Sequence, residues 1–160
     1  MAMSQTRSDV TGELRRCWGQ DLDAATLYEL LRLRVAVFVV EQSCPYPELD
    51  GRDLAAQTRH FWLQETSGEV IATLRLIEEN PDGRKLFRIG RVCTKQTARG
   101  LGHTTRLLRA ALADVGRHRC AINAQTYLIE MYAGHGFAVD GDEFLEDGIP
   151  HVPMLRAQRP

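Results

Sequence analysis

The segment at residues 87–115, FRIGRVCTKQTARGLGHTTRLLRAALADV, constrains the fold of this chain more than any other. It reads as a β-strand, a turn interrupted by glycines at positions 100 and 102, and an amphipathic helix. Glycine lets the backbone adopt positive φ and approach a ligand closely. The first N–H groups of a helix have no partner within it and lie at the positive end of its dipole. The segment therefore predicts an anion site, most often for phosphate, although an ordinary strand-to-helix connection explains it equally well.

The length and the hydrophobic pattern indicate one domain, residues 1–160, of which the polar residues 1–10 are expected to be flexible. A helix at 27–40 precedes three alternating segments at 60–65, 70–77 and 86–94, which predict an antiparallel meander. The helix after the glycine turn and a short strand at 120–125 complete a strand–helix–strand unit, whose two strands are parallel. The expected fold is therefore α+β, with a mixed, mostly antiparallel central sheet flanked by helices.

Four local features refine the expected fold. Arg34 falls close to the apolar side of the first helix. The long loop at 41–56 carries Glu41, Asp50 and Asp53, and it is either functional or a solvated connection. Gly90, inside a strand, predicts a β-bulge or a close approach of backbone. Two prolines favour an edge position for the last strand, at 149–156.

The composition argues against several classes of function. Twenty basic and 21 acidic residues give a formal net charge of −1, which provides no long-range attraction to nucleic acid or to an acidic membrane. No apolar run reaches the ~18 residues of a membrane span, and the polar N-terminus does not read as a signal peptide. The four cysteines are scattered, with no C-x-x-C and no histidine at metal-ligand spacing. We therefore expect a cytoplasmic protein with reduced thiols, no bound metal, and neither nucleic acid nor membrane as a partner.

Two motifs in a defined order give the anion site a more specific interpretation. Residues 99–104 (RGLGHT) match the first four positions of R/Q-x-x-G-x-G/A, and residues 132–137 (YAGHGF) match Y-x-x-x-G-F throughout. This combination resembles the GNAT superfamily of acetyl-CoA-dependent N-acetyltransferases. The ElaA-type branch is similar also at residues 31–46 (LRLRVAVFVVEQSCPY), 59–60 (RH) and 146–151 (EDGIPH), and at Gln125, seven residues before Tyr132. The resemblance covers about residues 22–156 and departs from the loop pattern at Thr104, where the family has Gly or Ala.

The resemblance implies a three-layer α/β fold in which the parallel strand pair opens to hold acetyl-CoA as the co-substrate. The pantetheine arm would pair with the strand backbone at Val92, Cys93 and Thr94, like an added strand. The pyrophosphate would bind the N–H groups of the glycine loop, which consists of Arg99, Gly100, Leu101, Gly102, His103 and Thr104. Gln125 completes the residues expected at the cofactor. The branched Cβ of Thr104 adds bulk in this loop, although its hydroxyl would be able to donate a hydrogen bond.

The resemblance also implies direct attack of an amine on the thioester, with much of the rate coming from holding the two reactants in line. A backbone N–H near Val92 would polarise the thioester carbonyl. Tyr132 would donate a proton to the departing thiolate; without the motif it reads as a core tyrosine beside Met131 and Leu128. Cys93 raises the alternative of a covalent route, but a buried free cysteine is usually a small hydrophobe, so we expect direct transfer.

The acceptor side is less constrained by the sequence. We take Glu41 as the general base, because it ends the first helix beside a long loop that would line the acceptor pocket. Glu146, His60 and His151 are the other candidates for the base, and Asp50 or Asp147 would bind a cationic acceptor. Each of these residues, taken alone, is as easily explained as a turn or cap residue.

The first hypothesis is therefore an N-acetyltransferase that acts on a small-molecule amine or a protein amino group. The alternatives are a non-catalytic acyl-CoA sensor with the same fold, and a transferase that uses another donor–acceptor pair, as the acyl-homoserine-lactone synthases do. Tyr132 favours catalysis, because binding alone needs no acid at the sulfur. The sequence leaves open the acceptor, the acyl-chain length and the oligomeric state, for which a homodimer is one option.

Overall fold

The computed structural model describes residues 12–160, so the expected flexibility of residues 1–10 lies outside the described residues. The elements in chain order are β1 (Glu13–Trp18), η1 (Gly19–Asp21), α1 (Ala24–Arg34), the π-helix η2 (Val35–Glu41), β2 (Thr58–Gln64), β3 (Val70–Glu79), β4 (Leu86–Thr94), η3 (Gln96–Ala98), α2 (His103–Val115), β5 (Arg119–Gln125), η4 (Thr126–Leu128), α3 (Ile129–Ala133), β6 (Ala138–Val139), β7 (Phe144–Glu146) and β8 (Ile149–Arg156). No helix within residues 12–160 is long and apolar enough to cross a membrane.

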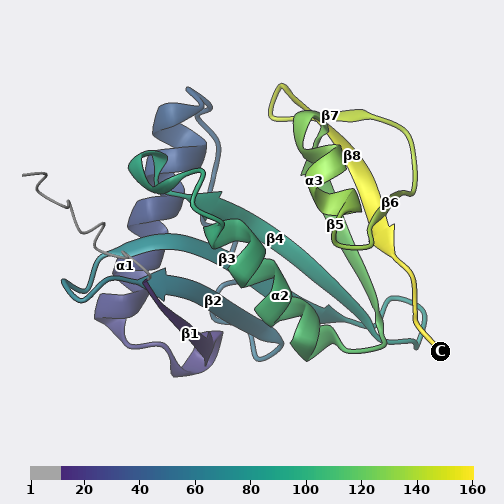
Figure 1. Ribbon diagram of the computed structural model, residues 1–160, viewed down its shortest axis with the longest axis horizontal. Coiled ribbons are helices and arrows are strands. Elements are labelled where there is room, and N and C mark those ends of the chain that lie inside the picture. The colour runs from purple at the N-terminus through teal and green to yellow at the C-terminus, as the bar shows by residue number, and fades with distance from the viewer. Residues whose placement is uncertain (1–11) are drawn as a thin grey trace, which may run out of the picture.

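The strands form one mixed sheet in the order β1-β2-β3-β4-β5-β8-β6, with β7 paired to β8. Every pairing is antiparallel except that of β4 with β5. Figure 1 shows α2 and α1 on opposite faces of the sheet. The fold expected from the sequence, a mostly antiparallel mixed sheet flanked by helices and containing one parallel pair, is confirmed.

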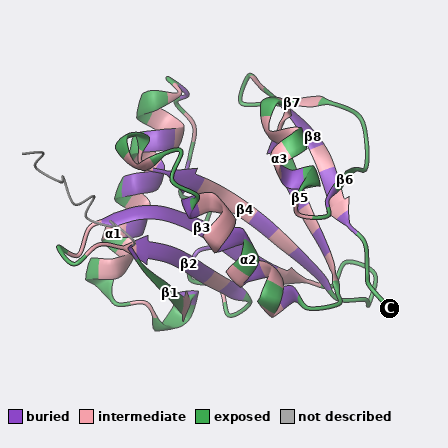
Figure 2. Ribbon diagram, viewed as in Figure 1, coloured by how far each residue is buried: buried purple, intermediate pink, exposed green. Residues whose placement is uncertain are grey.

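Each face of the sheet carries its own hydrophobic core. On one face, α2 buries Leu107, Leu108 and Ala111. On the other face, α1 and η2 bury Leu30 and Val37. Figure 2 shows the result as buried stretches along β2, β3 and β4, because strands covered on both faces bury side chains of both orientations.

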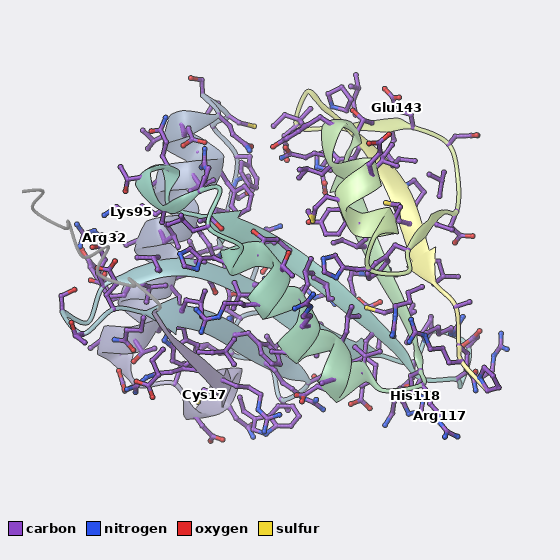
Figure 3. The ribbon with its side chains drawn as sticks, viewed as in Figure 1. Cys17, Arg32, Lys95, Arg117, His118 and Glu143 are labelled. Atoms are coloured by element: carbon purple, nitrogen blue, oxygen red, sulfur yellow. The ribbon has the colours of Figure 1, made fainter. Side chains whose placement is uncertain are left out.

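β4 and β5 pair only near their first residues, where residues 86–88 face residues 119–121. Beyond that point the two strands separate, because β5 continues its ladder with β8 while β4 stays with β3. A cavity of about 880 Å³ opens between them. Figure 3 shows side chains from the parts of the fold that carry β4 and β5 facing each other across this opening. The parallel pair therefore opens at its C-terminal ends.

Arg34 explains how the loop at 41–56 is held. Its side chain is 1% exposed, and its guanidinium lies 2.6 Å from Glu48 and 2.6 Å from Asp53, both in that loop. Asp53 also lies 3.1 Å from a guanidinium nitrogen of Arg75 on β3. A charge buried this deeply requires ionic partners. The cluster therefore fixes the loop against α1 and β3, where it becomes a wall of the cavity.

β4 contains a β-bulge directly after Gly90, where Leu74 of β3 faces two residues, Arg91 and Val92. Arg91 has a φ of 52°. An inserted residue reverses the alternation of side chains beyond it. Val92 accordingly packs on the α2 side of the sheet and Cys93 on the α1 side. The bulge expected at Gly90 thus lies one residue further along the strand.

β8 lies inside the sheet, so the expected edge position of the last strand is wrong. One side of β8 pairs with β5, whereas the other side is shared by β7 at residues 149–151 and β6 at residues 154–155. The carbonyl of Pro153 accepts a hydrogen bond from Asp140 N–H on the β6 side, at 2.8 Å. Pro153 therefore lies between the ladder with β7 and the ladder with β6, so the N–H group that proline lacks costs neither ladder a hydrogen bond.

Candidate active site

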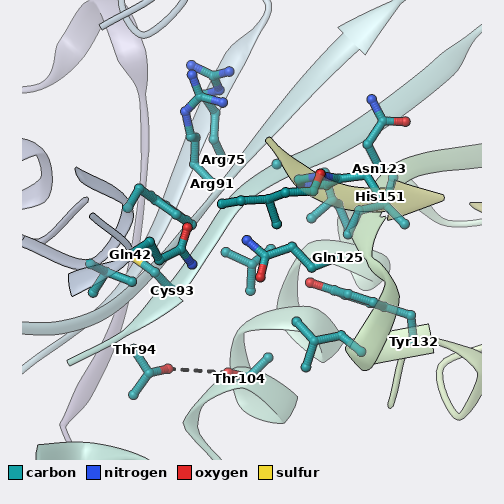
Figure 4. A pocket seen from close by; sticks show the side chains of 18 of the residues that line it. Gln42, Arg75, Arg91, Cys93, Thr94, Thr104, Asn123, Gln125, Tyr132 and His151 are labelled. Atoms are coloured by element: carbon teal, nitrogen blue, oxygen red, sulfur yellow. Dashed lines mark hydrogen bonds between the residues drawn. The ribbon is translucent and has the colours of Figure 1, made fainter. Parts of the chain in front are cut away.

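The cavity between β4 and β5 brings together most of the residues selected from the sequence (Figure 4). Those that line it are Glu41, Asp50, Val92, Cys93, Thr94, Arg99, Gly100, Gly102, His103, Thr104, Gln125, Tyr132, Glu146, Asp147 and His151. One end lies at the loop before α2, and the other lies at loop 41–56 and the β7–β8 turn. Its volume of about 880 Å³ lies in the range of small-molecule sites.

The loop before α2 forms an anion site at the first end of the cavity. Gly100 and Gly102 have φ values of 78° and 80°, which residues with a side chain rarely adopt. The first i→i−4 bond of α2 runs from the N–H of Arg106 to the carbonyl of Gly102, at 3.1 Å. The N–H groups of residues 103–105 therefore have no partner within the helix. Together with the helix dipole, they favour a phosphate at this end.

Arg99 connects the glycine loop to η2. Its Nε donates to the carbonyl oxygen of Thr94 at 3.1 Å, and its Nη2 lies 2.9 Å from a carboxylate oxygen of Glu41. Both charged side chains are partly exposed, so the ion pair contributes about 0–1 kcal/mol to stability. Glu41, the last residue of η2, is thereby placed at the phosphate end of the cavity.

Tyr132 lies on α3, and Figure 4 shows its hydroxyl pointing into the cavity toward Gln125. The helix ends where Gly136 takes a φ of 92° and the N–H of Phe137 donates back to the Tyr132 carbonyl at 3.3 Å. This turn sets the Phe137 ring edge-on against the Tyr132 ring, with centroids 6.1 Å apart. Tyr132 is 4% exposed, and burial raises its pKa. Its phenol is therefore protonated at neutral pH.

Cys93 occupies the environment of a small hydrophobic residue. It packs with Leu30, Val37 and Trp62 on the α1 side of the sheet. Burial raises the pKa of its thiol to about 12. A nucleophilic cysteine needs a lowered pKa, because the thiolate is the reactive form. Cys93 therefore lacks the environment that a covalent route requires.

Charged side chains held in ion pairs line the second end of the cavity. Two guanidinium nitrogens of Arg75 donate to the two carboxylate oxygens of Asp50, at 2.9 and 2.8 Å. Arg91 lies beside Arg75, as Figure 4 shows, and 3.5 Å from Asp50. Burial acts to raise the pKa of Asp50, but the hydrogen bonds from Arg75 outweigh it and lower this pKa. Asp50 is therefore an anion that its arginine partners already occupy.

His151 and Glu146 form a second polar pair, on the hairpin of β7 and β8. His151 faces Gln125 across the β5–β8 ladder, and opposed residues present their side chains on the same face of the sheet. Its Nδ1 lies 2.7 Å from the carbonyl oxygen of Ile149, so in the neutral ring Nδ1 carries the proton. Its Nε2 lies 3.5 Å from a carboxylate oxygen of Glu146. Nε2 is therefore the ring nitrogen that carries no proton in the neutral ring.

Two of the selected residues lie outside the cavity lining. Leu101 is 64% exposed, and its side chain faces solvent rather than the site. His60 is 1% exposed, and its Nε2 lies 2.9 Å from the carbonyl oxygen of Asp53. Burial lowers the pKa of His60. His60 therefore belongs to the cluster that holds loop 41–56 and does not reach the site.

Arg75 and Arg91 line the cavity and were missed in the sequence. Arg75 interrupts the apolar run of β3, VIATLRLIEE, and a charged residue in a buried strand is a signal that would have identified it. Arg91 gave no comparable signal, because the bulge that turns it toward loop 41–56 is not visible in the alternation of residues.

The residues present fit a CoA thioester. The free N–H groups before α2 suit its phosphates, and the edge of β4 beyond Arg88 has no β5 partner, so it is open to an extended arm. A Cβ placed at Gly100 or Gly102 would meet nothing within 4 Å, which leaves the loop surface open to a ligand. Within residues 12–160, no group of three or more His, Cys, Asp or Glu side chains is arranged to hold a metal ion.

A mixed sheet whose parallel pair opens beside a glycine loop and a helix N-terminus defines an acyltransferase of the GNAT type. The chain belongs to this family, since residues 26–157 match the family model for the acetyltransferase (GNAT) domain. The resemblance stated from the sequence is thereby confirmed, and so is the classification of the protein as an acetyltransferase.

Three relatives place the chain within the ElaA-type branch. It is 69% identical over 147 residues to UPF0039 protein Rv2851c of Mycobacterium tuberculosis, which covers 92% of this chain and 94% of that protein. It is 36% identical over 140 residues to protein ElaA of Escherichia coli, which covers 85% of this chain and 90% of that protein. The crystal structure of Escherichia coli ElaA gives a TM-score of 0.83 at 34% identity and covers 91% of this chain and 99% of that chain. The crystal structure of an acyl-CoA N-acyltransferase from Pseudomonas aeruginosa gives a TM-score of 0.81 at 39% identity, with 91% and 99% covered.

Proposed function

We propose that this protein transfers an acetyl group from acetyl-CoA to a primary amine, on a small molecule or a protein, by direct attack within a ternary complex. The observation that carries the proposal is one continuous cavity that joins the anion site before α2 to the hydroxyl of Tyr132. Bound acetyl-CoA supplies a thioester carbonyl that an amine can attack. Every other contribution comes from residues of the chain.

The binding residues act by positioning. The N–H groups of the loop at 99–104 and the first turn of α2 would hold the pyrophosphate. The edge of β4 at Val92, Cys93 and Thr94 that faces away from β3 would hold the pantetheine arm, and Gln125, which lines the same cavity as Tyr132, would orient its reactive end. Fixing the thioester in line with an amine supplies much of the rate in such reactions.

Tyr132 is proposed as the general acid. Its phenol is protonated at neutral pH, and its hydroxyl faces the cavity in which the sulfur would leave. Donation of this proton to the departing thiolate would accelerate the reaction by a factor of about 10²–10⁴. A module that only senses acyl-CoA has no use for a proton donor at this position.

The proton acceptor lies in one of two places. Glu41, the first choice from the sequence, has its carboxylate engaged by Arg99 at the phosphate end. His151 lines the cavity, and its Nε2 lies 3.5 Å from a carboxylate oxygen of Glu146. We therefore place His151 ahead of Glu41 as the base, and assign to Glu146 and Asp147 the attraction of a positively charged acceptor. The pH dependence of kcat/KM in Glu41→Gln and His151→Gln decides between the two bases. Only the loss of the true base removes the fall in kcat/KM at low pH, because that fall reports protonation of the base.

The proposal is tested by measuring release of the CoA thiol from acetyl-CoA with a panel of polyamines, amino acids, aminoglycosides and peptides. We expect thiol release that depends on the amine and yields the acetylated product. If acetyl-CoA raises the melting temperature while no amine releases thiol, the protein is a sensor and the enzymatic proposal fails.

A further inference from the structure

Arg91 combines an unusual backbone conformation with a side chain anchored in another segment. Within residues 12–160, the non-glycine residues with positive φ are Ser43, Arg91 and Asp147. The left-handed region is sparsely populated by residues with a Cβ, and such residues persist where the surrounding structure holds them. All three lie in segments that wall the cavity.

The side chain of Arg91 is held by loop 41–56, which provides all of its ionic and hydrogen-bond partners within residues 12–160. Its Nη2 donates to the carbonyl oxygen of Glu48 at 3.2 Å and lies 3.5 Å from Asp50. Its Nε lies 3.0 Å from the Glu48 carboxylate, close enough for an ion pair although not aligned for a hydrogen bond. Its guanidinium also lies 5.8 Å from the ring centroid of Tyr46. Glu48 is itself 2% exposed and bound to Arg34, so the anchor is rigid.

The bulge at Arg91 decides which residues of β4 face which side. Without the extra residue, Val92 would turn to the α1 side and Cys93 to the α2 side, because one inserted position reverses the alternation. The backbone groups of the segment at 92–94 would turn with them. The conformation of Arg91 therefore sets the strand edge on which the thioester is proposed to lie.

The backbone alone does not explain an arginine at this position. Glycine would adopt the same φ without strain. The side chain must therefore contribute something that glycine cannot, and its contacts connect β4 to Glu48 and Asp50. Asp50 is also bound to Arg75, which lines the same end of the cavity.

We propose that Arg91 is a positioning residue that couples residues 44–56 of loop 41–56 to the segment of β4 that would hold the thioester. This inference rests on the proposed acetyl transfer. An acceptor that contacts the part of loop 41–56 that lines the cavity would, through Arg91, stabilise the bulged register in which residues 92–94 present the thioester for attack. Arg91 itself touches neither the reacting carbonyl nor the sulfur.

The test separates the backbone of Arg91 from its side chain. Arg91→Gly retains the positive φ and removes the anchor, Arg91→Ala disfavours the φ and removes the anchor, and Arg91→Lys retains a charge that reaches the loop. Arg84→Gly, in the exposed turn before β4, controls for the loss of an arginine. For each variant we measure kcat, the KM for acetyl-CoA, the KM for the acceptor, and amide hydrogen exchange at residues 44–56 and 92–94.

Arg91→Gly is expected to lower kcat by about tenfold or more, to raise the KM for the acceptor, and to leave the KM for acetyl-CoA unchanged. Exchange should become faster in both segments, and Arg91→Lys should recover part of kcat. Wild-type kcat in Arg91→Gly overturns the proposal, whatever the exchange shows. If the wild-type protein has no acetyl transfer, the proposed function fails separately, and exchange then decides the coupling: unchanged protection at 92–94 in Arg91→Gly refutes it.

Discussion

The hydroxyl oxygens of Thr94 and Thr104 lie 3.3 Å apart, which joins the last residue of β4 to the first turn of α2. This contact gives a structural role to the threonine that departs from the family pattern. The hydroxyl of Thr104 is engaged by Thr94, whereas the N–H groups of the turn have no partner within the helix. The departure from Gly or Ala is therefore compatible with an anion site built from backbone.

Thr104→Val keeps the branched side chain and removes its hydroxyl. We expect a loss of about 0.5–1.5 kcal/mol in the free energy of unfolding, because one side-chain hydrogen bond is removed. The affinity for acetyl-CoA should change little, because backbone N–H groups make the proposed phosphate contacts. Urea denaturation and calorimetric titration measure the two quantities. A large loss of affinity with unchanged stability would show that the hydroxyl binds the ligand directly.

Arg34 offers a test of the cluster that holds loop 41–56. Arg34→Met leaves the buried carboxylates of Glu48 and Asp53 without a main partner, so we expect a loss of about 3–5 kcal/mol in the free energy of unfolding. Arg32→Met is the matched control, because Arg32 is 69% exposed and, among residues 12–160, pairs only with Glu29 on the same helix, a contact worth about 0–1 kcal/mol. Equal losses in the two variants, measured by urea denaturation, would contradict this account of the cluster.

His60 should make stability depend on pH. Burial lowers its pKa in the folded state, and the nearby guanidinium groups of Arg34 and Arg75 act in the same direction. Near pH 6.5 the unfolded chain therefore binds more protons at this position than the folded protein does, and the stability contribution is lost as pH falls below about 6.5. In His60→Gln the decline in the urea midpoint between about pH 7.5 and 5.5 should be shallower. The exposed His118→Gln serves as the control, and an unchanged slope in His60→Gln would refute the assignment.

Cys93 should form no acyl-enzyme. Its thiol has a pKa of about 12 and so contributes almost no thiolate at neutral pH. Incubation with acetyl-CoA in the absence of amine should leave the intact mass of the protein unchanged at early times. An added acetyl group that maps to Cys93 and disappears when amine is supplied would establish the covalent route instead.

The sequence predicted the parts of the fold that depend on local patterns. The strand, glycine turn and helix at residues 87–115 follow from alternation, glycine and helical spacing, and the two motifs place Tyr132 after the next strand. The interior position of β8 could not be predicted in this way. Its neighbours β6 (two residues) and β7 (three residues) are too short for alternation to show how they pair, and Pro153 falls between their ladders.

The acceptor side was harder to predict because its residues meet through tertiary contacts. Arg34, Arg75 and Arg91 come from three elements, and they converge on carboxylates of one loop. Periodicity does not reveal such pairing, and the bulge shifts Arg91 by one position. For the same reason His60, which the motif placed at the site, lies beneath the loop.

The most direct test of the proposed mechanism is acetyl transfer by Tyr132→Phe compared with the wild-type protein, with the acetylated amine quantified by mass spectrometry. Phenylalanine preserves the ring and its edge-on contact with Phe137 but cannot donate a proton. We predict that kcat falls by about 10²–10⁴ while the dissociation constant of acetyl-CoA stays the same. Wild-type turnover in Tyr132→Phe, or no amine-dependent turnover in the wild-type protein, would contradict the account.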